Sequence, residues 1–327
     1  MKTIKIKYVD VWQGFDQETY YITQILKKHF HVVFSDEPDY ILYSCFGYEH
    51  LKYNDCVKIC FLGENLCPDF NLCDYAIAFE ELSFGDRYIW RPASIDLFAA
   101  PELYNRSMRI VQNEARTSFC SYVYSNGSAD LFREKLFEAI KQYKPILCGG
   151  KLHHNIDIPH IEGNDFRTDR IAFEKQFKFS IACENSSHPG YCTEKILISF
   201  IAGTIPIYWG DPSIKKIYNE KAFINVLDYP SLEDLVDTIR KIDTDDALYE
   251  DMIHQPVFAP GWDPHKYMEQ FETFLFHIFE QPKKDAYRRN LTFWGEKYSS
   301  LMDEWHDSWQ NKQARSFPKW KFWKRFI

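Results

Sequence analysis

FKFSIACENSSHPGYCTEKILISFIAGTIPIYWG, at residues 177–210, has the pattern of a strand, a polar loop, a helix and a second strand. The first strand is predicted over Phe177–Cys183, which is apolar, rich in β-prone residues and bounded by charge. Proline, glycine and an Asn-Ser-Ser run predict a loop over Glu184–Cys192, and Thr204–Trp209 is the predicted returning strand. Such β-α-β units bind nucleotides at the loop that follows the first strand.

The helix between these strands is predicted to be buried. Thr193 is its predicted N-cap, and Glu194 lies in the first turn, where a carboxylate complements the positive helix end. Ile196–Ala202 is apolar on all sides rather than along one stripe, which is typical of a helix inside a core. Gly203 is the predicted C′ residue, because glycine adopts the left-handed conformation easily.

The loop before this helix carries polar side chains that are unusual for a buried unit. Asn185, Tyr191, Glu194 and Lys195 lie between the end of a strand and the start of a helix. A pyrophosphate there would meet free backbone N–H groups, a favourable helix dipole and a lysine charge. The glycine pattern is neither a P-loop nor GxGxxG, so an NTPase or a dinucleotide enzyme is not supported. The alternative is an ordinary helix start with capping polar residues and a solvated Lys195.

Two segments resemble a known family. ENSSHPGYCTEKI, followed by TIPIYWGDPSI, is similar to the donor-site signature of the α1,3/α1,4-fucosyltransferases of glycosyltransferase family 10, in particular the bacterial, Helicobacter-type enzymes. That signature has the approximate form F-x-x-x-x-E-N-S, Y-x-T-E-K and P-I-Y-W-G. A second resemblance lies upstream in FLGENLCPDFNLCDYAIAFEEL, at Phe61–Leu82. Together they relate most of residues 1–275 to the family.

The resemblance implies an α/β fold of the GT-B class, with two Rossmann-like domains facing across a cleft. The domains are predicted at residues 1–112 on the acceptor side and 113–275 on the GDP-fucose side. C-terminal helices are expected at 276–313 and a basic aromatic tail at 314–327. Residue patterns alone also predict two successive α/β units, but they do not distinguish GT-B from other two-domain α/β proteins.

Residue patterns predict further elements outside the central stretch. Strands are expected at Ile4–Val11, His31–Phe34, Tyr40–Cys45, Val57–Leu62, Asp74–Phe79 and Thr117–Tyr124. Helices are expected at Gln17–Phe30, Ala129–Tyr143, Leu232–Ile242 and Tyr267–Phe279. Phe84–Asn113 is polar and is expected to be irregular, with the linker between the domains near its end.

The resemblance implies an enzyme that transfers L-fucose from GDP-fucose, with inversion at the anomeric carbon. The implied acceptor position is O3 of the GlcNAc or Glc in N-acetyllactosamine or lactose, giving Lewis x-like glycans. An α1,4-fucosyltransferase acting on type I acceptors, and a non-catalytic protein that binds nucleotide or glycan, stay open as alternatives. No cofactor is expected to be obligatory, and stimulation by Mn²⁺ or Mg²⁺ stays open.

Glu64 is the predicted catalytic base. It follows the strand Val57–Leu62 and should therefore project from the carboxyl edge of the sheet. It also matches the glutamate of the family's G-E-N segment, to which the resemblance assigns the base role. Such a base must reach the acceptor hydroxyl while an oxocarbenium-like transition state forms. Alternatively, Glu64 holds backbone N–H groups of its loop, and Glu184 and Glu194 are competing candidates.

The predicted donor site combines two cations with several polar residues. The resemblance implies that Arg133 contacts the diphosphate, which arginine can bind bidentately, and a solvated helix arginine is the alternative. Lys195 is predicted to contribute a point charge, and Glu194 is predicted to hold fucose or ribose hydroxyls. The family match also implies donor contacts at Asn126, Asn185, Tyr191 and Thr193. No metal site is predicted, because the DTDD run at Asp243–Asp246 lies far from the signature and is predicted to be a capping turn.

Acceptor recognition is predicted in the first domain. Trp12 follows the first strand, and Phe84–Trp90 supplies further aromatic residues. Aromatic faces of this kind can stack on a sugar ring. Packing in the core is the alternative role for both.

Composition and charge exclude several classes of protein. A net charge of −8 argues against broad nucleic-acid binding. Nine cysteines, an odd number, favour a reducing compartment, and the spacing of Cys56, Cys60, Cys67 and Cys73 does not fit a zinc site. MKTIKIKYVDVW at the start alternates like a strand, and no apolar stretch reaches the roughly 20 residues that span a bilayer. We therefore expect no signal peptide and a place in the bacterial cytoplasm, peripheral at the inner face of the membrane.

Residues 314–327, ARSFPKWKFWKRFI, combine basic and aromatic side chains. Positive charges come from Arg315, Lys319, Lys321, Lys324 and Arg325, with no acidic residue among them. Such a segment favours an anionic membrane surface, where each cation contributes about 1 kcal/mol. The alternatives are a solvated end or a helix that packs back on the core.

Overall fold

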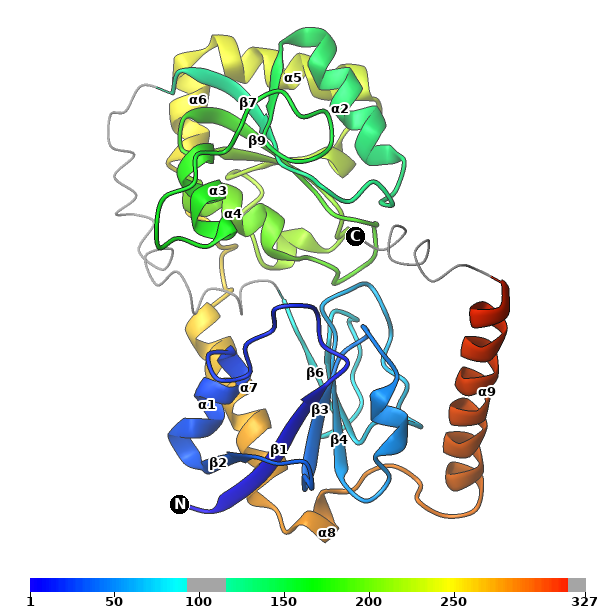
Figure 1. The fold of residues 1–327 in the computed structure, drawn as a ribbon. Helices are drawn as coiled ribbons and strands as arrows, with labels where there is room; N and C mark the ends of the chain where they lie inside the picture. Colours follow the sequence, from blue (N-terminus) through cyan, green and yellow to red (C-terminus); the bar gives the residue numbers. More distant parts are fainter. Residues whose placement is uncertain (93–115, 317–327) are drawn as a thin grey trace. The chain divides into compact units, whose positions relative to one another are not determined.

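The computed structural model describes residues 1–92 and 116–316, and these residues form two compact units (Figure 1). The first unit contains Met1–Arg91 and the chain from His265 onward, and the second unit ends at Pro264. Each unit is built on one parallel sheet. The prediction of two Rossmann-like α/β units is therefore confirmed.

The first unit contains a six-stranded parallel sheet. Its strands are β1 (Thr3–Val9), β2 (His31–Phe34), β3 (Tyr40–Tyr43), β4 (Val57–Phe61), β5 (Tyr75–Ala78) and β6 (Tyr88–Trp90). They lie in the order β2-β1-β3-β4-β5-β6, and every adjacent pair is parallel. β3, β4 and β5 are buried along their whole length, as expected for parallel strands covered on both faces.

Helices from both ends of the chain pack together in this unit. In α1 (Tyr21–His29), His29 Nε2 lies 2.6 Å from Glu272 Oε1 of α7 (Pro264–Glu280). Phe279 of α7 also packs on Tyr40 of β3, with ring centroids 4.6 Å apart. The remaining helices are α8 (Lys283–Ala286) and α9 (Trp294–Ser316), and α9 contacts the 3₁₀ turn η1 (Glu49–Lys52).

The second unit contains a five-stranded parallel sheet in the order β11-β10-β9-β7-β8. Its strands are β7 (Ser118–Tyr122), β8 (Ile146–Cys148), β9 (Phe177–Cys183), β10 (Ile205–Trp209) and β11 (Ile224–Asn225). Helices α2 (Phe132–Tyr143), α5 (Leu232–Thr244) and α6 (Asp246–Ile253) pack together, and α3 (Phe166–Glu174) packs against α4 (Glu194–Ala202) (Figure 1). Two 3₁₀ turns, η4 (Ile214–Lys216) and η5 (Val226–Asp228), follow β10.

The stretch at residues 177–210 forms the predicted β-α-β unit, with β9, α4 and β10 in sequence. Residues 195–200 of α4 are all buried, which confirms the prediction of a helix inside the core. Gly203 follows α4 with φ 80°, the left-handed conformation that glycine adopts without strain. Thr193 is the N-cap residue, but its hydroxyl does not bond to the helix backbone.

Both sheets place their first strand between the second and the third, counted within each unit. After β1 the chain therefore adds one strand on one side of β1 and the next strand on its other side. The strands that follow β7 are added in the same way. This reversal leaves a crevice between the carboxyl ends of the first and third strands, where open α/β sheets bind ligands. The two positions are the ends of β1 and β3 in the first unit and of β7 and β9 in the second.

Some predicted boundaries differ from the structure for local reasons. α1 begins at Tyr21 rather than Gln17, because Asp16 accepts hydrogen bonds from the Glu18 N–H (2.9 Å) and the Thr19 hydroxyl (2.7 Å), which favour a turn. β6 lies inside the segment expected to be irregular, since a strand of three residues is too short to show a period. Within residues 1–92 and 116–316, no helix is both long enough and apolar enough to cross a membrane.

The C-terminal helices belong with the first unit. The sequence assigned residues up to 275 to the second domain and 276–313 to separate helices, whereas the structure groups the chain from His265 onward with Met1–Arg91. Asp74 connects these segments: it accepts hydrogen bonds from the N–H groups of Arg288 and Arg289, each at 2.8 Å, and from Arg289 Nε at 2.9 Å. The predicted linker near residue 112, and residues 317–327 of the predicted tail, lie outside the described residues.

Asp74→Ala is expected to destabilise the first unit by about 3–5 kcal/mol, because Arg289 would keep a buried charge without its partner. Urea denaturation followed by circular dichroism measures the loss, and hydrogen exchange of the β4 and β5 amides localises it. Asp36→Ala is the control, since the Asp36 side chain is 98% exposed and its ion pair with Lys7 contributes little. Equal stability of the two variants would contradict the structural role of Asp74.

Candidate functional site

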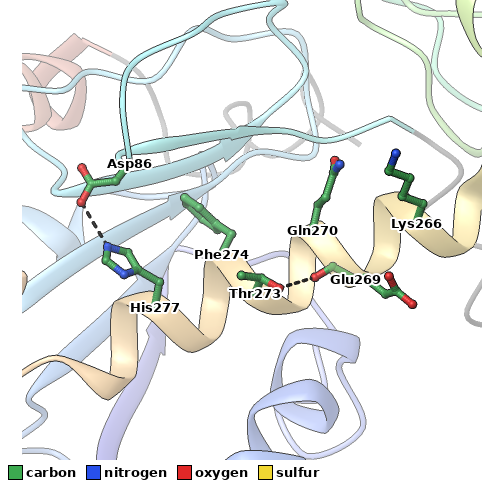
Figure 2. Close-up of a pocket in the computed structure, with 7 residues that line it drawn as sticks. All are labelled: Asp86, Lys266, Glu269, Gln270, Thr273, Phe274 and His277. Carbon is green, nitrogen blue, oxygen red and sulfur yellow. Dashed lines mark hydrogen bonds and ion pairs between the residues drawn. The ribbon is translucent and has the colours of Figure 1, made fainter.

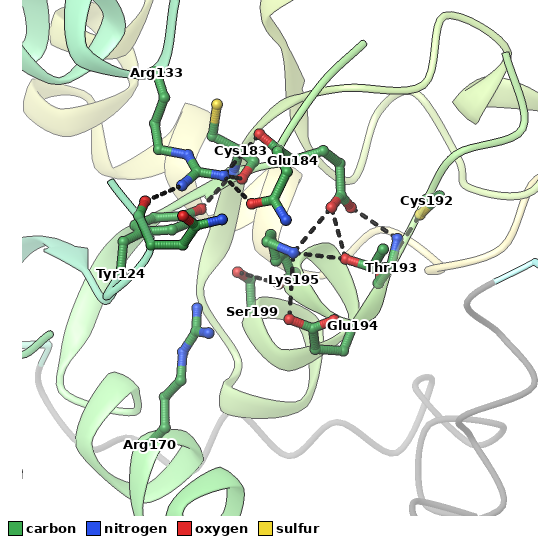
Figure 3. A network of polar contacts seen from close by, with 12 residues as sticks. Tyr124, Arg133, Arg170, Cys183, Glu184, Cys192, Thr193, Glu194, Lys195 and Ser199 are labelled. Carbon is green, nitrogen blue, oxygen red and sulfur yellow. Dashed lines mark hydrogen bonds and ion pairs between the residues drawn. The ribbon is translucent and has the colours of Figure 1, made fainter. Parts of the chain in front are cut away.

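Arg133 joins the two strand ends that flank the crevice of the second sheet (Figure 3). From the first turn of α2, its Nη1 donates to Asn126 O (3.3 Å), beyond the end of β7. Its Nη2 donates to the carbonyl oxygens of Cys183 (3.3 Å) and Glu184 (2.9 Å) and to Asn185 Oδ1 (2.7 Å), at the end of β9. The side chain is 3% exposed, and its Nε–H has no hydrogen-bond partner in the described part of the chain. The guanidinium thus holds together the segments that follow β7 and β9, and its Nε–H is unused.

Tyr124 also holds the end of β9, and its ring packs against this guanidinium. Its hydroxyl donates to Ile181 O (2.9 Å) and accepts from the Cys183 N–H (2.6 Å). The guanidinium carbon of Arg133 lies 4.3 Å from the centroid of the Tyr124 ring, a favourable cation–π distance. A Cβ at Gly150 would come within 2.1 Å of Tyr124 O, so only glycine allows the following loop to approach this backbone.

Glu184 is a fully buried carboxylate between the end of β9 and the start of α4. Its Oε1 accepts from the Thr193 N–H (2.8 Å), its Oε2 accepts from the Thr193 hydroxyl (2.6 Å), and Lys195 Nζ lies 3.1 Å from Oε2. Burial raises the pKa of Glu184 above its ordinary value, although the Lys195 charge opposes this shift. These contacts explain why the Thr193 hydroxyl does not cap α4: it donates to Glu184 instead.

Lys195 and Glu194 complete this ion-pair network at the N-terminus of α4. Lys195 Nζ donates to Thr193 Oγ1 at 2.8 Å and lies 3.4 Å from Glu194 Oε1. Burial alone would lower the pKa of Lys195, but the charges of Glu184 and Glu194 raise it above the ordinary value. Burial also opposes the charge of Glu194, yet Lys195 and Arg170 lower the pKa of Glu194 to about 2. Both groups are therefore charged at neutral pH.

Arg170 is a member of this region that the sequence analysis missed. On α3, its Nε donates to Glu174 Oε1 at 2.8 Å, and the Ser180 hydroxyl donates to Glu174 Oε2 at 2.9 Å. The Arg170 side chain is buried, and its Nη2 has no hydrogen-bond partner among the described residues. Figure 3 shows the guanidinium pointing toward Tyr124 and the α4 network. The i, i+4 spacing of Arg170 and Glu174 was the available signal, but it is common on exposed helices.

The predicted donor residues lie together in this part of the second unit. Asn126 and Asn185 both accept from Arg133, while Thr193, Glu194 and Lys195 form the ion-pair network with Glu184. Tyr191 is 1% exposed, so its ring lies in the interior rather than on an open stacking surface. The roles of these side chains toward a donor stay predictions.

The DTDD run at Asp243–Asp246 forms the predicted capping turn. Asp245 is the N-cap of α6 and accepts from the N–H groups of Ala247 (3.0 Å) and Leu248 (3.2 Å). Asp243 is buried and pairs with Lys144 at 2.9 Å. These carboxylates are thus used in helix capping and packing.

Glu64 and Trp12 lie at the carboxyl edge of the first sheet. Glu64 follows β4 and is partly exposed, and Trp12 follows β1 with 38% of its surface exposed. Phe61, the last residue of β4, links the two segments, because its ring centroid lies 6.5 Å from that of Trp12. Burial and the Glu64 charge both raise the pKa of the Cys45 thiol. Glu64 thus lies at the carboxyl edge of the sheet, one strand along from the crevice between β1 and β3.

Trp12 belongs to an aromatic cluster at this edge. It makes edge-to-face contacts with Phe15 (4.9 Å between ring centroids), Tyr20 (5.8 Å) and Phe46 (6.2 Å). Phe46 is 51% exposed. Trp12 thus packs against neighbouring rings and still presents part of its surface, so both predicted roles are compatible with its position.

A surface pocket of about 470 Å³ lies elsewhere in the first unit (Figure 2). It is lined by Asp86, Lys266, Glu269, Gln270, Thr273, Phe274 and His277. His277 Nε2 lies 3.2 Å from Asp86, which also pairs with Arg288 at 2.6 Å. The pocket contains none of the predicted site residues, and Asp86 serves the attachment of the C-terminal helices.

The lowered pKa of Glu194 predicts that the stability of the fold depends on pH. Because its pKa is lower in the folded chain, about 2, than its ordinary 4.5, its charge stabilises the fold above pH 4.5, and this contribution is lost as pH falls toward 2. The urea midpoint of the native chain should therefore fall more between pH 5 and pH 3 than that of Glu194→Gln. Glu162→Gln, at an exposed position, is the control and should follow the native chain. Parallel profiles for all three proteins would contradict the ion-pair assignment.

Comparisons with known proteins identify a family for this chain. The family profile "Alpha-(1,3)-fucosyltransferase FucT N-terminal domain" matches residues 6–95, and "Glycosyltransferase family 10 (fucosyltransferase) C-term" matches residues 113–254. An alpha-(1,3)-fucosyltransferase FucT of Helicobacter pylori is 31% identical over 63% of this chain and 48% of its own length. A 3-galactosyl-N-acetylglucosaminide 4-alpha-L-fucosyltransferase of Bos taurus is 30% identical over 41% of this chain and 35% of its own. The chain thus spans about half, or less, of the length of these relatives.

The fold of this chain is also similar to that of solved fucosyltransferase structures. An alpha1,3-fucosyltransferase with GDP has a TM-score of 0.68 at 25% identity, covering 84% of this chain and 90% of its own. Another alpha1,3-fucosyltransferase structure has a TM-score of 0.72 at 24% identity, covering 89% and 93%. The GT-B fold class, with two parallel-sheet α/β domains, is thereby confirmed. The chain belongs to glycosyltransferase family 10, the fucosyltransferase family.

Proposed function

We propose that this chain transfers L-fucose from GDP-fucose, with inversion, to O3 of the GlcNAc or Glc in N-acetyllactosamine- or lactose-type acceptors. The observation that carries the proposal is the arrangement of Arg133 and Lys195. Both cations are held at the carboxyl edge of the second sheet, beside the N-terminus of α4. A related alpha1,3-fucosyltransferase was crystallised with GDP, which supports a nucleoside diphosphate as the ligand of this edge.

On the donor side, the site must stabilise negative charge as GDP departs. Arg133 offers its unused Nε–H, and Lys195 offers a permanent positive charge. The N-terminal N–H groups of α4 add a favourable dipole. Because contacts with Glu184 and the β9 carbonyls already fix both cations, little reorganisation is needed when the charge develops.

On the acceptor side, Glu64 acts as the general base. The acceptor oxygen forms a bond to C1 of fucose while the bond between C1 and the phosphate oxygen breaks. The hydroxyl proton passes to the Glu64 carboxylate, and GDP leaves with the bonding electron pair. The partial exposure of Glu64 at the sheet edge supports this role, because the base must be reachable by a sugar hydroxyl.

Two alternatives differ in their products. An α1,4-fucosyltransferase would modify O4 of GlcNAc in type I acceptors, as the name of the Bos taurus relative describes for that protein. A non-catalytic protein would bind nucleotide or glycan without turnover. The exposed Trp12 and Phe46 support a sugar acceptor, but they do not select between O3 and O4.

A product assay tests the proposal. The purified chain is incubated with GDP-fucose and, in parallel, with N-acetyllactosamine, lactose and a type I disaccharide, without added metal and then with Mn²⁺ or Mg²⁺. We expect fucose on O3, identified by NMR of the product. Fucose only on O4 of the type I acceptor would select the α1,4 alternative, and binding of GDP-fucose without any turnover would select the non-catalytic one.

Glu64→Gln tests, in the same assay, whether Glu64 is the general base. Since glutamine cannot accept the proton, we expect kcat to fall by at least about 100-fold, while the affinity for GDP is unchanged. Glu49→Gln, on the same unit but in η1, is the control and should keep both values. Unchanged turnover in Glu64→Gln would remove the base assignment while leaving the donor site intact.

We further propose that the basic aromatic segment 314–327 binds the inner face of a bacterial cytoplasmic membrane. Its sequence supports this, and the preceding helix α9 exposes Trp294, Leu301 and Trp305. Deleting 314–327 should abolish sedimentation with anionic liposomes and leave turnover on soluble acceptors unchanged. Neutral liposomes are the control. Sedimentation that survives the deletion would contradict this role of the tail.

A further inference from the structure

Three potential metal ligands converge on the outer side of α2. Glu134 and Glu138 lie one helical turn apart on this helix, and His153 reaches them from the loop after β8. One ligand atom from each residue lies within 4.8 Å of the other two. Side chains at i and i+4 share a helix face, so the convergence follows from the helical spacing and from the path of the loop.

His153 is held in an orientation suited to coordination. Its ring stacks on Phe137 with centroids 4.2 Å apart and an interplanar angle of 16°. Its Nε2 lies 2.8 Å from Glu134 Oε1. The backbone of His153 has φ 51°, in the left-handed region that a non-glycine residue rarely adopts. The imidazole is therefore held against the carboxylate face of α2, with about a third of its surface exposed.

We propose that Glu134, Glu138 and His153 form a binding site for a divalent transition-metal ion of the Zn²⁺ type. One imidazole nitrogen with two carboxylate oxygens is a donor set that such ions accept, and water molecules complete the coordination. Two carboxylates balance the charge of the ion when the imidazole is neutral. In the described part of the chain, the hydrogen bonds of the Arg133 and Lys195 side chains involve none of these three residues, so the metal site shares no ligand with the proposed donor site.

The ion would join the His153 loop to the helix that carries Arg133. Leu152 N–H, in the same loop, donates to Tyr124 O at 2.9 Å, and Gly150 lies directly against the Tyr124 backbone. Coordination would thus link α2 to the segment that supports the Arg133 guanidinium. We expect metal binding to raise the unfolding temperature, because the ion binds the folded arrangement and not the unfolded chain.

Lys141 provides a test of Glu138 as a metal ligand. Its Nζ lies 3.0 Å from Glu138 Oε1, so this cation competes with an ion for the same carboxylate. Lys141→Gln should therefore tighten metal binding. A purely structural His153–Glu134 pair predicts no such gain.

Isothermal titration of the full chain with Zn²⁺ tests the site, in a Cys67→Ser background because Cys67 is an exposed thiol. We expect one Zn²⁺ per chain, at least about tenfold weaker binding in His153→Gln and Glu138→Gln, and tighter binding in Lys141→Gln. His254→Gln is the matched control: His254 pairs with Glu250 on α6 at 3.3 Å, but the described residues place no third ligand beside them. The control should bind like the parent chain.

Thermal unfolding with and without Zn²⁺ gives a second measurement on the same variants. The parent chain and His254→Gln should gain stability with the ion, and His153→Gln should not. Absence of Zn²⁺ binding by the parent chain, or an unchanged isotherm in His153→Gln, would overturn the proposal. Lys141→Gln with unchanged affinity would overturn the assignment of Glu138 as a ligand. None of these measurements depends on fucose transfer.

Discussion

The hydrogen bonds of the Arg133 guanidinium are the interaction on which the candidate site of the second unit depends. At the reversal point of an open parallel sheet, the connections that follow two adjacent strands leave in opposite directions. Arg133 donates to the Asn126 carbonyl beyond β7 and to the Cys183 and Glu184 carbonyls at the end of β9, so it joins the two connections that diverge there. Lysine could not do this, because its ammonium lacks the planar set of donors.

The same strand order in both units explains where the chemistry-bearing residues lie. Trp12 follows β1, and the predicted donor residues follow β7 and β9, so they flank the reversal points of the two sheets. Glu64 lies one strand farther along, after β4, but at the same carboxyl edge. These positions follow from the parallel direction of the strands rather than from proximity in the sequence.

Local features of the fold could be predicted from the sequence, whereas contacts between distant segments could not. The strand Phe177–Cys183, the buried helix and Gly203 follow from composition and capping rules. No periodicity could indicate that Asp74 accepts from Arg289, and so the C-terminal helices were assigned apart from the first unit. Similarly, Arg170 has the spacing of a solvated ion pair, and only the fold shows that it is buried beside Glu194.

The charged side chains around α4, all buried except the partly exposed Glu194, also constrain how a donor could be recognised. Positive charges come from Arg133, Arg170 and Lys195, and negative charges from Glu174, Glu184 and Glu194. The network is therefore balanced before any ligand arrives, so net positive charge cannot be the main source of affinity for a diphosphate. A diphosphate would instead be recognised by groups of fixed direction. The unused Arg133 Nε–H and the N-terminal dipole of α4 are held in place by their neighbours. Fixed dipoles stabilise charge that develops in a transition state more than charge already present, because they need not reorganise. In the proposed reaction, a balanced network of fixed groups would therefore suit the departure of GDP better than its tight retention.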